Sequence, residues 1–243
     1  MSESKDTQDR LGRLRLKTQY LQAMGIQPWM PRDDNAAAND NVADAPPVAA
    51  RDAAVPAWAD LEARVASCTL CGLHEGRTQT VFGTGNRQAD WLIIGEAPGA
   101  DEDRQGEPFV GRAGLLLNEM LLAAGYRREQ VYIANILKCR PPNNRNPHVD
   151  EVQCCHGYLQ QQIDLIQPRL ILAVGGIAAH NLLGTDGPVG KLRGTVHHYG
   201  DRQIPLVVTY HPAYLLRTPL EKRKVWADLQ FARRISNSTV RDI

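Results

Sequence analysis

The stretch at residues 90–114, DWLIIGEAPGADEDRQGEPFVGRAG, gathers residue types that can do chemistry. An apolar run at 91–94 stops abruptly at Gly95, so the pattern predicts a buried strand that breaks into a tight loop. Between Gly95 and Asp103 the loop carries four carboxylates, and one aromatic ring, Phe109, follows between a proline and a glycine-arginine pair. The carboxylates are Glu96, Asp101, Glu102 and Asp103. This combination predicts a reactive loop at the carboxyl end of a strand, with a solvated acidic loop as the simpler alternative.

Four of the five cysteines have the spacing of metal ligands. Cys68 and Cys71 form a C-x2-C pair, and Cys139 and Cys155 follow with fifteen residues between them. Four thiolates from separate segments suit a tetrahedral zinc or a four-cysteine iron-sulfur cluster, and the spacing does not choose between these. Cys155 shares an apolar face at helical spacing, whereas Cys154 is turned about 100° away, so we expect Cys155 as the fourth ligand. Ordinary burial of the distant pair is the alternative.

Length and charge narrow the class of protein. A chain of 243 residues can hold one α/β domain with a substantial core, plus tails. The net charge of +1 excludes a broadly basic protein, so any contact with nucleic acid must come from a local patch. The polar N-terminus has no signal-peptide pattern and the longest apolar run, at 170–179, is too short for a membrane span. We therefore expect a cytoplasmic protein of the bacterial cytosol or nucleoid, with no membrane partner and no disulfide framework.

Apolar runs alternate with helical patterns through most of the chain. The predicted strands are 91–94, 131–136, 170–174 and 204–209. The predicted helices are 57–66, 112–124, 149–166, 177–183 and 219–235. This alternation implies a parallel sheet covered on both faces, with a ligand crevice at the carboxyl ends of its strands. Glu96, Asn135 and His211 follow three of these ends, so they can converge on one site.

The N-terminal residues differ in composition from the rest. We expect a short helical docking-type peptide at 1–32, because an apolar helix face ends in a glycine and Trp29 follows as an anchor. Residues 33–57, rich in alanine, aspartate and proline, are predicted to be a flexible linker. The folded domain is predicted at 58–237, with a tail at 238–243.

Taken together, the motifs resemble those of the family 4 uracil-DNA glycosylases, the iron-sulfur branch of the uracil-DNA glycosylase superfamily. The likeness rests on GEAPGADED at 95–103, GEPFVGRAG at 106–114, NILKCRPPNNRNP at 135–147, HPAYLLR at 211–217 and the cysteines. It implies a three-layer α/β/α sandwich with a central four-stranded parallel sheet. It also implies a 4Fe-4S cluster held by Cys68, Cys71, Cys139 and Cys155. The cluster would fix DNA-facing loops without redox chemistry.

The resemblance implies hydrolysis of the N-glycosidic bond of uracil in DNA after base flipping, leaving an abasic site. Phe109 would stack on the flipped ring. The amide of Asn135 would pair with the edge of uracil and reject cytosine. His211 would donate to uracil O2 as negative charge develops there. The backbone of the first loop would also face the base, through Gly95, Ala97, Pro98 and Gly99.

One position departs from related branches of the superfamily. Ala97 stands where some of them hold an aspartate or asparagine that positions water, so the carboxylate must come from elsewhere. Glu96 and Glu102 are the candidates, and Glu102→Gln is expected to slow bond cleavage more than DNA binding. A histidine-bearing insertion that traps the sugar in a sister branch is absent, so we expect turnover.

DNA contacts are predicted around the motif loops. Residues 212–217 would form a loop that enters the DNA, with Leu215 or Leu216 as a wedge for the vacated stack. The expected phosphate contacts are Arg112, Lys138, Arg140, Arg145, Lys191, Arg193 and Arg217. Each of these basic residues alone is more often plain surface.

Two other classes of protein and one binding partner are also compatible with the sequence. A catalytically inactive uracil-binding or damage-binding module would bind uracil-DNA and release no uracil. A nucleotide-dependent iron-sulfur redox enzyme would also use a parallel sheet, but no G-x-G-x-x-G follows the first strand. Residues 20–32 faintly resemble the N-terminal peptide of the psi subunit of the bacterial clamp loader, which suggests a replication clamp-loader partner.

Overall fold

The computed structural model describes residues 49–238, with side-chain surroundings from residue 57 onward. These residues belong to a compact unit that spans Pro47–Ile243. The predicted docking peptide, most of the predicted linker and the last five residues of the tail lie outside the described residues. No helix in the described range is long and apolar enough to cross a membrane.

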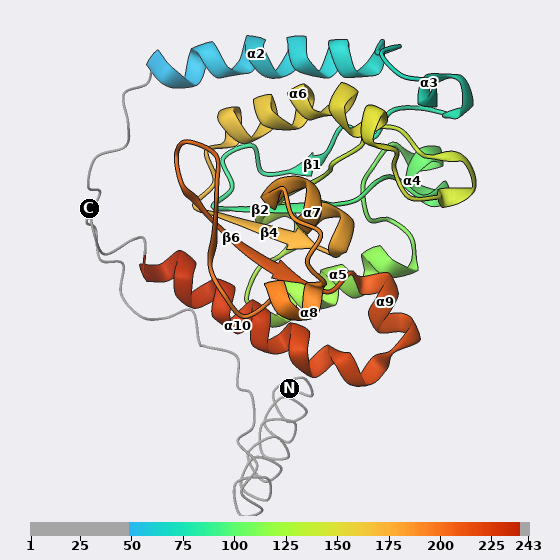
Figure 1. Ribbon diagram of the computed structural model, residues 1–243. Coiled ribbons are helices and arrows are strands. Elements are labelled where there is room, and N and C mark those ends of the chain that lie inside the picture. Colours follow the sequence, from blue (N-terminus) through green and yellow to red (C-terminus); the bar gives the residue numbers. More distant parts are fainter. Residues whose placement is uncertain (1–48, 239–243) are drawn as a thin grey trace, which may run out of the picture. The chain divides into compact units, whose positions relative to one another are not determined.

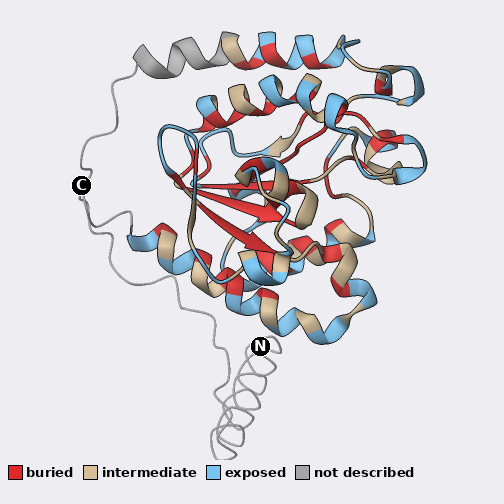
Figure 2. Ribbon diagram, in the orientation of Figure 1, coloured by how far each residue is buried: buried red, intermediate tan, exposed pale blue. Residues whose placement is uncertain are grey.

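A six-stranded sheet in the order β1-β3-β2-β4-β6-β5 forms the centre of the domain. The four predicted strands are confirmed as its parallel middle: β2 (Trp91–Gly95), β3 (Tyr132–Asn135), β4 (Leu170–Val174) and β6 (Ile204–Thr209). Two antiparallel edge strands, β1 (Thr84–Gly85) and β5 (His197–Tyr199), correct the predicted count of four. Both are too short or too polar to give a strand pattern. Every residue of β2, β3 and β4 is buried (Figure 2), as a sheet covered on both faces requires.

Helices pack on the two faces of the sheet and give the predicted three-layer α/β/α sandwich (Figure 1). On one face lie α2 (Ala49–Ala66), α6 (Val149–Ile166) and α7 (Gly176–Leu183). On the other lie α5 (Arg112–Ala123), α9 (Pro212–Arg217) and α10 (Lys222–Ser238). Side chains of β2 alternate between the two cores: Leu92 and Ile94 face α6, whereas Trp91 and Ile93 face α5 and α10.

Helix ends differ from the prediction in a few places. Helix α2 begins at Ala49 rather than at residue 57, so the end of the predicted linker is helical. Three of the acidic residues of the first motif, Asp101, Glu102 and Asp103, lie in a short helix, α4 (Ala100–Gln105), rather than in a loop. Residues 212–217, predicted as a loop, form α9, with Pro212 at its first position, where proline favours a helix. The remaining short elements are α3 (Leu73–Gly76), η1 (Arg128–Gln130), η2 (Pro142–Asn144), α8 (Val189–Leu192) and η3 (Pro219–Glu221).

A buried ion pair fixes the end of β6 to α10. Arg193 donates from Nε and Nη2 to the two oxygens of Asp228, at 3.0 and 2.7 Å. Thr209, the last residue of β6, donates its hydroxyl to the same carboxylate at 2.8 Å. Arg193 therefore serves the fold rather than a DNA phosphate, which corrects its predicted role. Burial raises the pKa of the Asp228 carboxyl, and the bonds from Arg193 and Thr209 oppose that rise.

We expect Arg193→Ala to lower the free energy of unfolding by about 3 kcal/mol, because it leaves the Asp228 carboxylate buried and unpaired. The matched control is Arg202→Ala, which breaks the Arg202–Asp164 pair at 3.0 Å, where both side chains are about half exposed (47% and 48%). That change should cost less than about 1 kcal/mol. Denaturant unfolding midpoints measure both losses of stability. Equal losses would show that the Arg193–Asp228 pair contributes no more than an exposed ion pair.

Candidate active site

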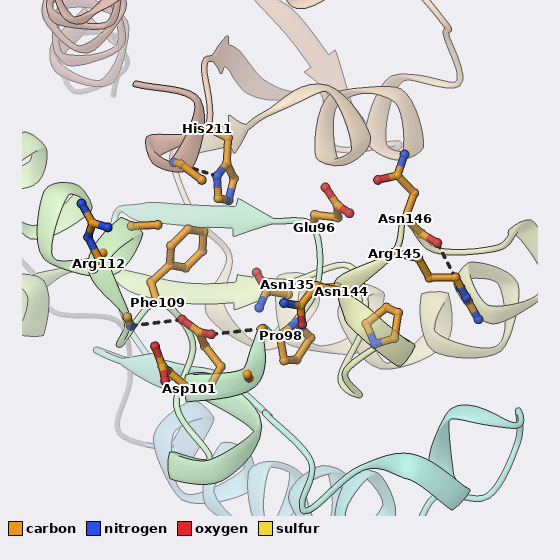
Figure 3. A pocket seen from close by; sticks show the side chains of 18 of the residues that line it. Glu96, Pro98, Asp101, Phe109, Arg112, Asn135, Asn144, Arg145, Asn146 and His211 are labelled. Atoms are coloured by element: carbon orange, nitrogen blue, oxygen red, sulfur yellow. Dashed lines mark hydrogen bonds between the residues drawn. The ribbon is translucent and has the colours of Figure 1, made fainter. Parts of the chain in front are cut away.

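An open cavity of about 620 Å³ lies where β2, β3 and β6 end (Figure 3). Eleven of the eighteen residues predicted for catalysis, substrate or DNA line it: Glu96, Ala97, Pro98, Gly99, Glu102, Phe109, Arg112, Asn135, Arg145, His211 and Arg217. Phe109, Asn135 and His211 come from three distant segments and meet here, as the sheet topology requires.

Phe109 is held in an unusual backbone conformation. Its φ is +54°, in the left-handed region, which costs about 1–2 kcal/mol for a residue with a side chain. Its ring lies 5.5 Å from the ring of His211, tilted by 31°. Gly95 makes room for it, since a Cβ there would lie 2.6 Å from Phe109 Cζ and 2.4 Å from Asn135 Oδ1. A larger residue at 95 would push both groups out of place.

Asn135 presents an unpaired amide to the cavity. The residue is 2% exposed, and no donor in the described part of the chain reaches its Oδ1. Its backbone carbonyl is fixed instead, because Lys138 Nζ donates to it at 2.9 Å. A buried polar group without a partner is costly unless a ligand supplies one. The unpaired Oδ1 therefore makes Asn135 a candidate to bind a ligand that enters the cavity.

The imidazole of His211 has a defined tautomer. The backbone N–H of Ala213 donates to His211 Nδ1 at 3.1 Å, so Nδ1 carries no proton and the neutral ring carries its proton on Nε2. Burial lowers the pKa of His211 to about 4, and the positive charge of Arg217 acts in the same direction. His211 is thus a neutral hydrogen-bond donor at physiological pH.

The two candidate carboxylates have different surroundings. Glu102 accepts backbone N–H groups from Gly99 at 3.1 Å, Val110 at 3.1 Å and Gly111 at 3.3 Å. These bonds hold Glu102 against the backbone, and its expected role in positioning water stays a prediction. Glu96 lines the cavity, and none of the residues from 57 to 238 donates a hydrogen bond to its carboxylate. Burial raises the pKa of the Glu96 carboxyl.

Two more of the predicted DNA contacts are corrected by the structure. Lys138 is 1% exposed and donates to Gln162 Oε1 at 2.6 Å as well as to Asn135, so its ammonium cannot reach a phosphate. Leu215 is fully buried in the core beneath α9, which leaves Leu216, 39% exposed, as the candidate wedge.

The remaining predicted DNA-binding basic residues fall into two groups: some hydrogen-bond to neighbouring side chains, and others are exposed. Arg145 donates to both oxygens of Glu151, at 2.9 and 2.5 Å, and Arg140 donates to Asn144 at 2.8 Å. Arg112, Lys191 and Arg217 are exposed, and Arg112 and Arg217 stand at the rim of the cavity.

The cysteines gather beneath the segment that follows β3. Cys139 and Cys155 are each 3% exposed and share a small apolar cluster, against which Cys71 packs. Electrostatic interactions link Cys71 and Cys139 to Cys68. Arg77 Nη1 donates to Cys139 Sγ at 3.1 Å, whereas Cys154 donates to the Leu70 carbonyl. Within the described range no three His, Cys, Asp or Glu side chains are close enough to enclose a single metal ion.

Several residues around the cavity were not predicted from the sequence. Asp101, Asn144, Asn146 and Tyr214 also line it. Asn143 and Asn144 both have a φ of +54°, and the PPNN sequence is a turn signal that could have drawn attention to them. Tyr214 could have been found from its helical spacing of three after His211. Arg128, which contacts the Phe109 segment, carries no sequence signal.

Comparison with known proteins agrees with this site. The sequence matches the model of the uracil DNA glycosylase superfamily over residues 82–230, which is more than half of the chain. The type-4 uracil-DNA glycosylase of Archaeoglobus fulgidus is 42% identical over 177 residues, covering 70% of this chain and 89% of that protein. The type-4 enzyme of Thermotoga maritima is 46% identical over 156 residues (63% and 80%), and that of Pyrobaculum aerophilum 43% over 171 (68% and 87%). The chain therefore belongs to the uracil-DNA glycosylase superfamily and, within it, to the type-4 family.

These similarities do not favour either alternative class, the inactive binding module or the redox enzyme. They also lend no support to a clamp-loader contact, and residues 20–32 lie outside the described residues.

We expect Gly95→Ala to reduce glycosylase activity by roughly a hundredfold, because the new methyl group displaces Phe109 or Asn135 by about 1 Å. Gly176→Ala is the control: a Cβ there meets its nearest neighbour, Val189, at an ordinary 3.6 Å. Activity assays at matched protein concentration measure both. Full activity in Gly95→Ala would mean that the site tolerates movement of these two side chains.

Proposed function

We propose that this protein removes uracil from DNA by hydrolysing the N-glycosidic bond of a flipped nucleotide, leaving an abasic site. The observation that carries the proposal is the meeting of Phe109, Asn135 and His211 in one cavity, with the Asn135 amide unpaired. A flat imide base needs an aromatic face to stack on, an amide that both donates and accepts hydrogen bonds, and a neutral donor to one of its carbonyl oxygens. The type-4 names of the relatives support uracil as that base.

Recognition would depend on the amide of Asn135. The amide carries a donor and an acceptor side by side, so it can pair with O4 and N3–H of uracil at once. Cytosine would bring an amino group against the amide donor and an unprotonated nitrogen against its acceptor. Because the site is buried, such a mismatch leaves polar groups unpaired and is costly. Phe109 would stack on one face of the base while this pairing forms.

Cleavage of the bond leaves negative charge on the base and positive charge on the sugar. The Nε2–H of His211 would donate to uracil O2, where the negative charge gathers, and no proton transfer is needed for this. Glu96 would lie on the sugar side, because of the two candidate carboxylates it is the one that is not bonded to backbone. There it would stabilise the cationic sugar and orient the attacking water.

The cysteine cluster would hold a 4Fe-4S cluster through Cys68, Cys71, Cys139 and Cys155. The four thiols of such a cluster bind four different iron atoms, so they need not converge on one point as zinc ligands do. The N–H···S bond from Arg77 to Cys139 suits a negatively charged thiolate. The group would brace the chain between β3 and α6, and it would supply no chemistry to base removal.

DNA would be held at the rim of the cavity by Arg112 and Arg217, with Lys191 further out and Leu216 entering the stack. Each phosphate contact would make the affinity fall with salt. Binding of a replication clamp-loader partner through residues 20–32 stays a prediction, which comparing the proteins captured by the intact chain and by Trp29→Ala would test.

The decisive experiment incubates the purified protein with an oligonucleotide that contains one uracil, and with a control that has thymine at that position. We expect free uracil and an alkali-sensitive abasic site from the first only. His211→Asn should lower the rate by about a hundredfold or more, because the shorter amide does not place a donor where the Nε2–H of His211 lies. Binding of uracil-DNA without any release of uracil would overturn the proposal and favour the inactive module.

The pH dependence of cleavage follows from the two shifted groups. An unperturbed histidine would titrate near pH 6.5, but the pKa of His211 is about 4, so it stays neutral well below pH 6. The pKa of Glu96 is raised, so its carboxylate is the first of the two groups to take up a proton as the pH falls. We therefore expect single-turnover rates to fall on acidification with a midpoint set by Glu96. Glu96→Gln should remove that acid limb, and a midpoint near pH 6.5 that disappears in His211→Asn would contradict this assignment.

A further inference from the structure

The strained turn that carries Phe109 is held from both sides by ionised side chains. Arg128 of η1 donates from Nη2 to the Pro108 carbonyl at 2.5 Å and from Nη1 to the Phe109 carbonyl at 3.2 Å. On the other side, Glu102 Oε1 accepts the N–H groups of Val110 and Gly111. A cation thus binds the carbonyls of the turn while an anion binds its amides.

These contacts fix the two peptide planes that flank the α-carbon of Phe109. The Pro108 carbonyl belongs to the plane that precedes Phe109, and the orientation of that plane sets φ. The Phe109 carbonyl and the Val110 N–H belong to the plane that follows, which sets ψ. Arg128 binds both planes, and Glu102 binds the second from the opposite end. Both backbone dihedrals of Phe109 are therefore set by side-chain contacts.

The strained conformation needs such support. A phenylalanine at a φ of +54° persists only where the surrounding structure holds it. Helix α5 adds a steric limit, since a Cβ on Gly114 would lie 1.8 Å from the Phe109 carbonyl oxygen. Arg128 is itself anchored, because its Nη1 also donates to Asn118 Oδ1 of α5 at 3.1 Å. The guanidinium thus joins α5 and the turn through three acceptors.

Glu102 connects the same turn to the first motif loop. Its second oxygen, Oε2, accepts the N–H of Gly99 at 3.1 Å, at the start of α4. One carboxylate therefore sets the distance between the loop that begins at Glu96 and the ring of Phe109. The loop and the ring both line the cavity (Figure 3).

We propose that Arg128 and Glu102 are positioning residues for base capture: together they hold Phe109 in the left-handed conformation that presents its ring to the flipped base. Arg128 does not line the cavity, so it acts only through Phe109. Release of the turn lets Phe109 relax to a negative φ, which turns its ring away from the base. This inference rests on the proposed function, because it assigns the ring its stacking role.

The test compares Arg128→Met, which keeps the length of the side chain but removes its donors, with Arg127→Met at the exposed neighbouring arginine. Two probes separate stacking from general binding. Free uracil, used as a competitive inhibitor, must stack on Phe109, whereas an oligonucleotide with a tetrahydrofuran abasic site makes phosphate contacts and brings no base. We expect Arg128→Met to weaken uracil inhibition about tenfold, the scale of one base-aromatic stack, and to leave abasic-DNA affinity within twofold. Arg127→Met should change neither.

A second variant and a double-mutant cycle distinguish the proposed role from a simple loss of folding. Glu102→Gln keeps the shape of the side chain but turns an amide NH2 toward backbone N–H groups, so it should weaken uracil inhibition in the same way. In a Phe109→Ala background, Arg128→Met should neither weaken uracil inhibition nor slow cleavage further, because the ring it holds is gone.

Three results would overturn the inference: additive effects of Arg128→Met and Phe109→Ala, an equal loss of abasic-DNA binding, or uracil inhibition as strong in Arg128→Met as in Arg127→Met. Failure of the proposed function looks different, since the unmodified protein would then release no uracil.

Discussion

The pairing of Gly95 with Asn135 across β2 and β3 is the constraint on which the site depends. Parallel register places these two residues side by side where their strands end, so a position without a side chain lies next to an amide. The space left by Gly95 is filled by the ring of Phe109 on one side and by the Asn135 amide on the other. An aromatic face and a polar edge can therefore meet at one buried point without a cavity in the core.

Helix α6 supports this arrangement from beneath the sheet edge. Three of its buried residues, Glu151, Cys155 and Gln162, are spaced by four and then seven positions and so share one face. Glu151 binds Arg145 at the cavity, Cys155 belongs to the cysteine cluster, and Gln162 receives the Lys138 ammonium. Burial lowers the pKa of Lys138 to about 8. The chain between β3 and α6 is thus attached to one helix at three positions along its length. These contacts limit how far Asn135 and the turn at η2 can move.

Much of the fold could be predicted from the sequence because it follows from local patterns. The four apolar runs became the four parallel strands, and the apolar stripe of residues 149–166 became α6 with the same ends. The edge strands could not be predicted, since a two-residue strand and the sequence HHY have no periodicity. The convergence of Glu96, Asn135 and His211 was predictable because parallel strands all end at one edge.

The roles of single charged residues were predicted less well. Lys138 and Arg193 resemble DNA contacts in sequence, but their partners, Gln162 and Asp228, lie 24 and 35 residues further along. Whether a basic side chain faces solvent or a buried acceptor is decided by tertiary packing, and no local signal distinguishes the two cases. Arg128 was missed for the same reason, because its acceptors are backbone carbonyls on a distant turn.

Glu96 and Glu102 show how the same chemical group can take two roles six residues apart. Backbone N–H groups that surround a carboxylate hold it in place, and they leave fewer of its lone pairs for a water molecule. Glu102 is in that position, which suits it to hold loops together. Glu96 has the opposite surroundings: burial without donors makes its charge costly and keeps its oxygens free. A cationic sugar or a water molecule would relieve that cost. The difference in hydrogen bonding, rather than the position in the motif, therefore points to Glu96 as the carboxylate that meets the substrate.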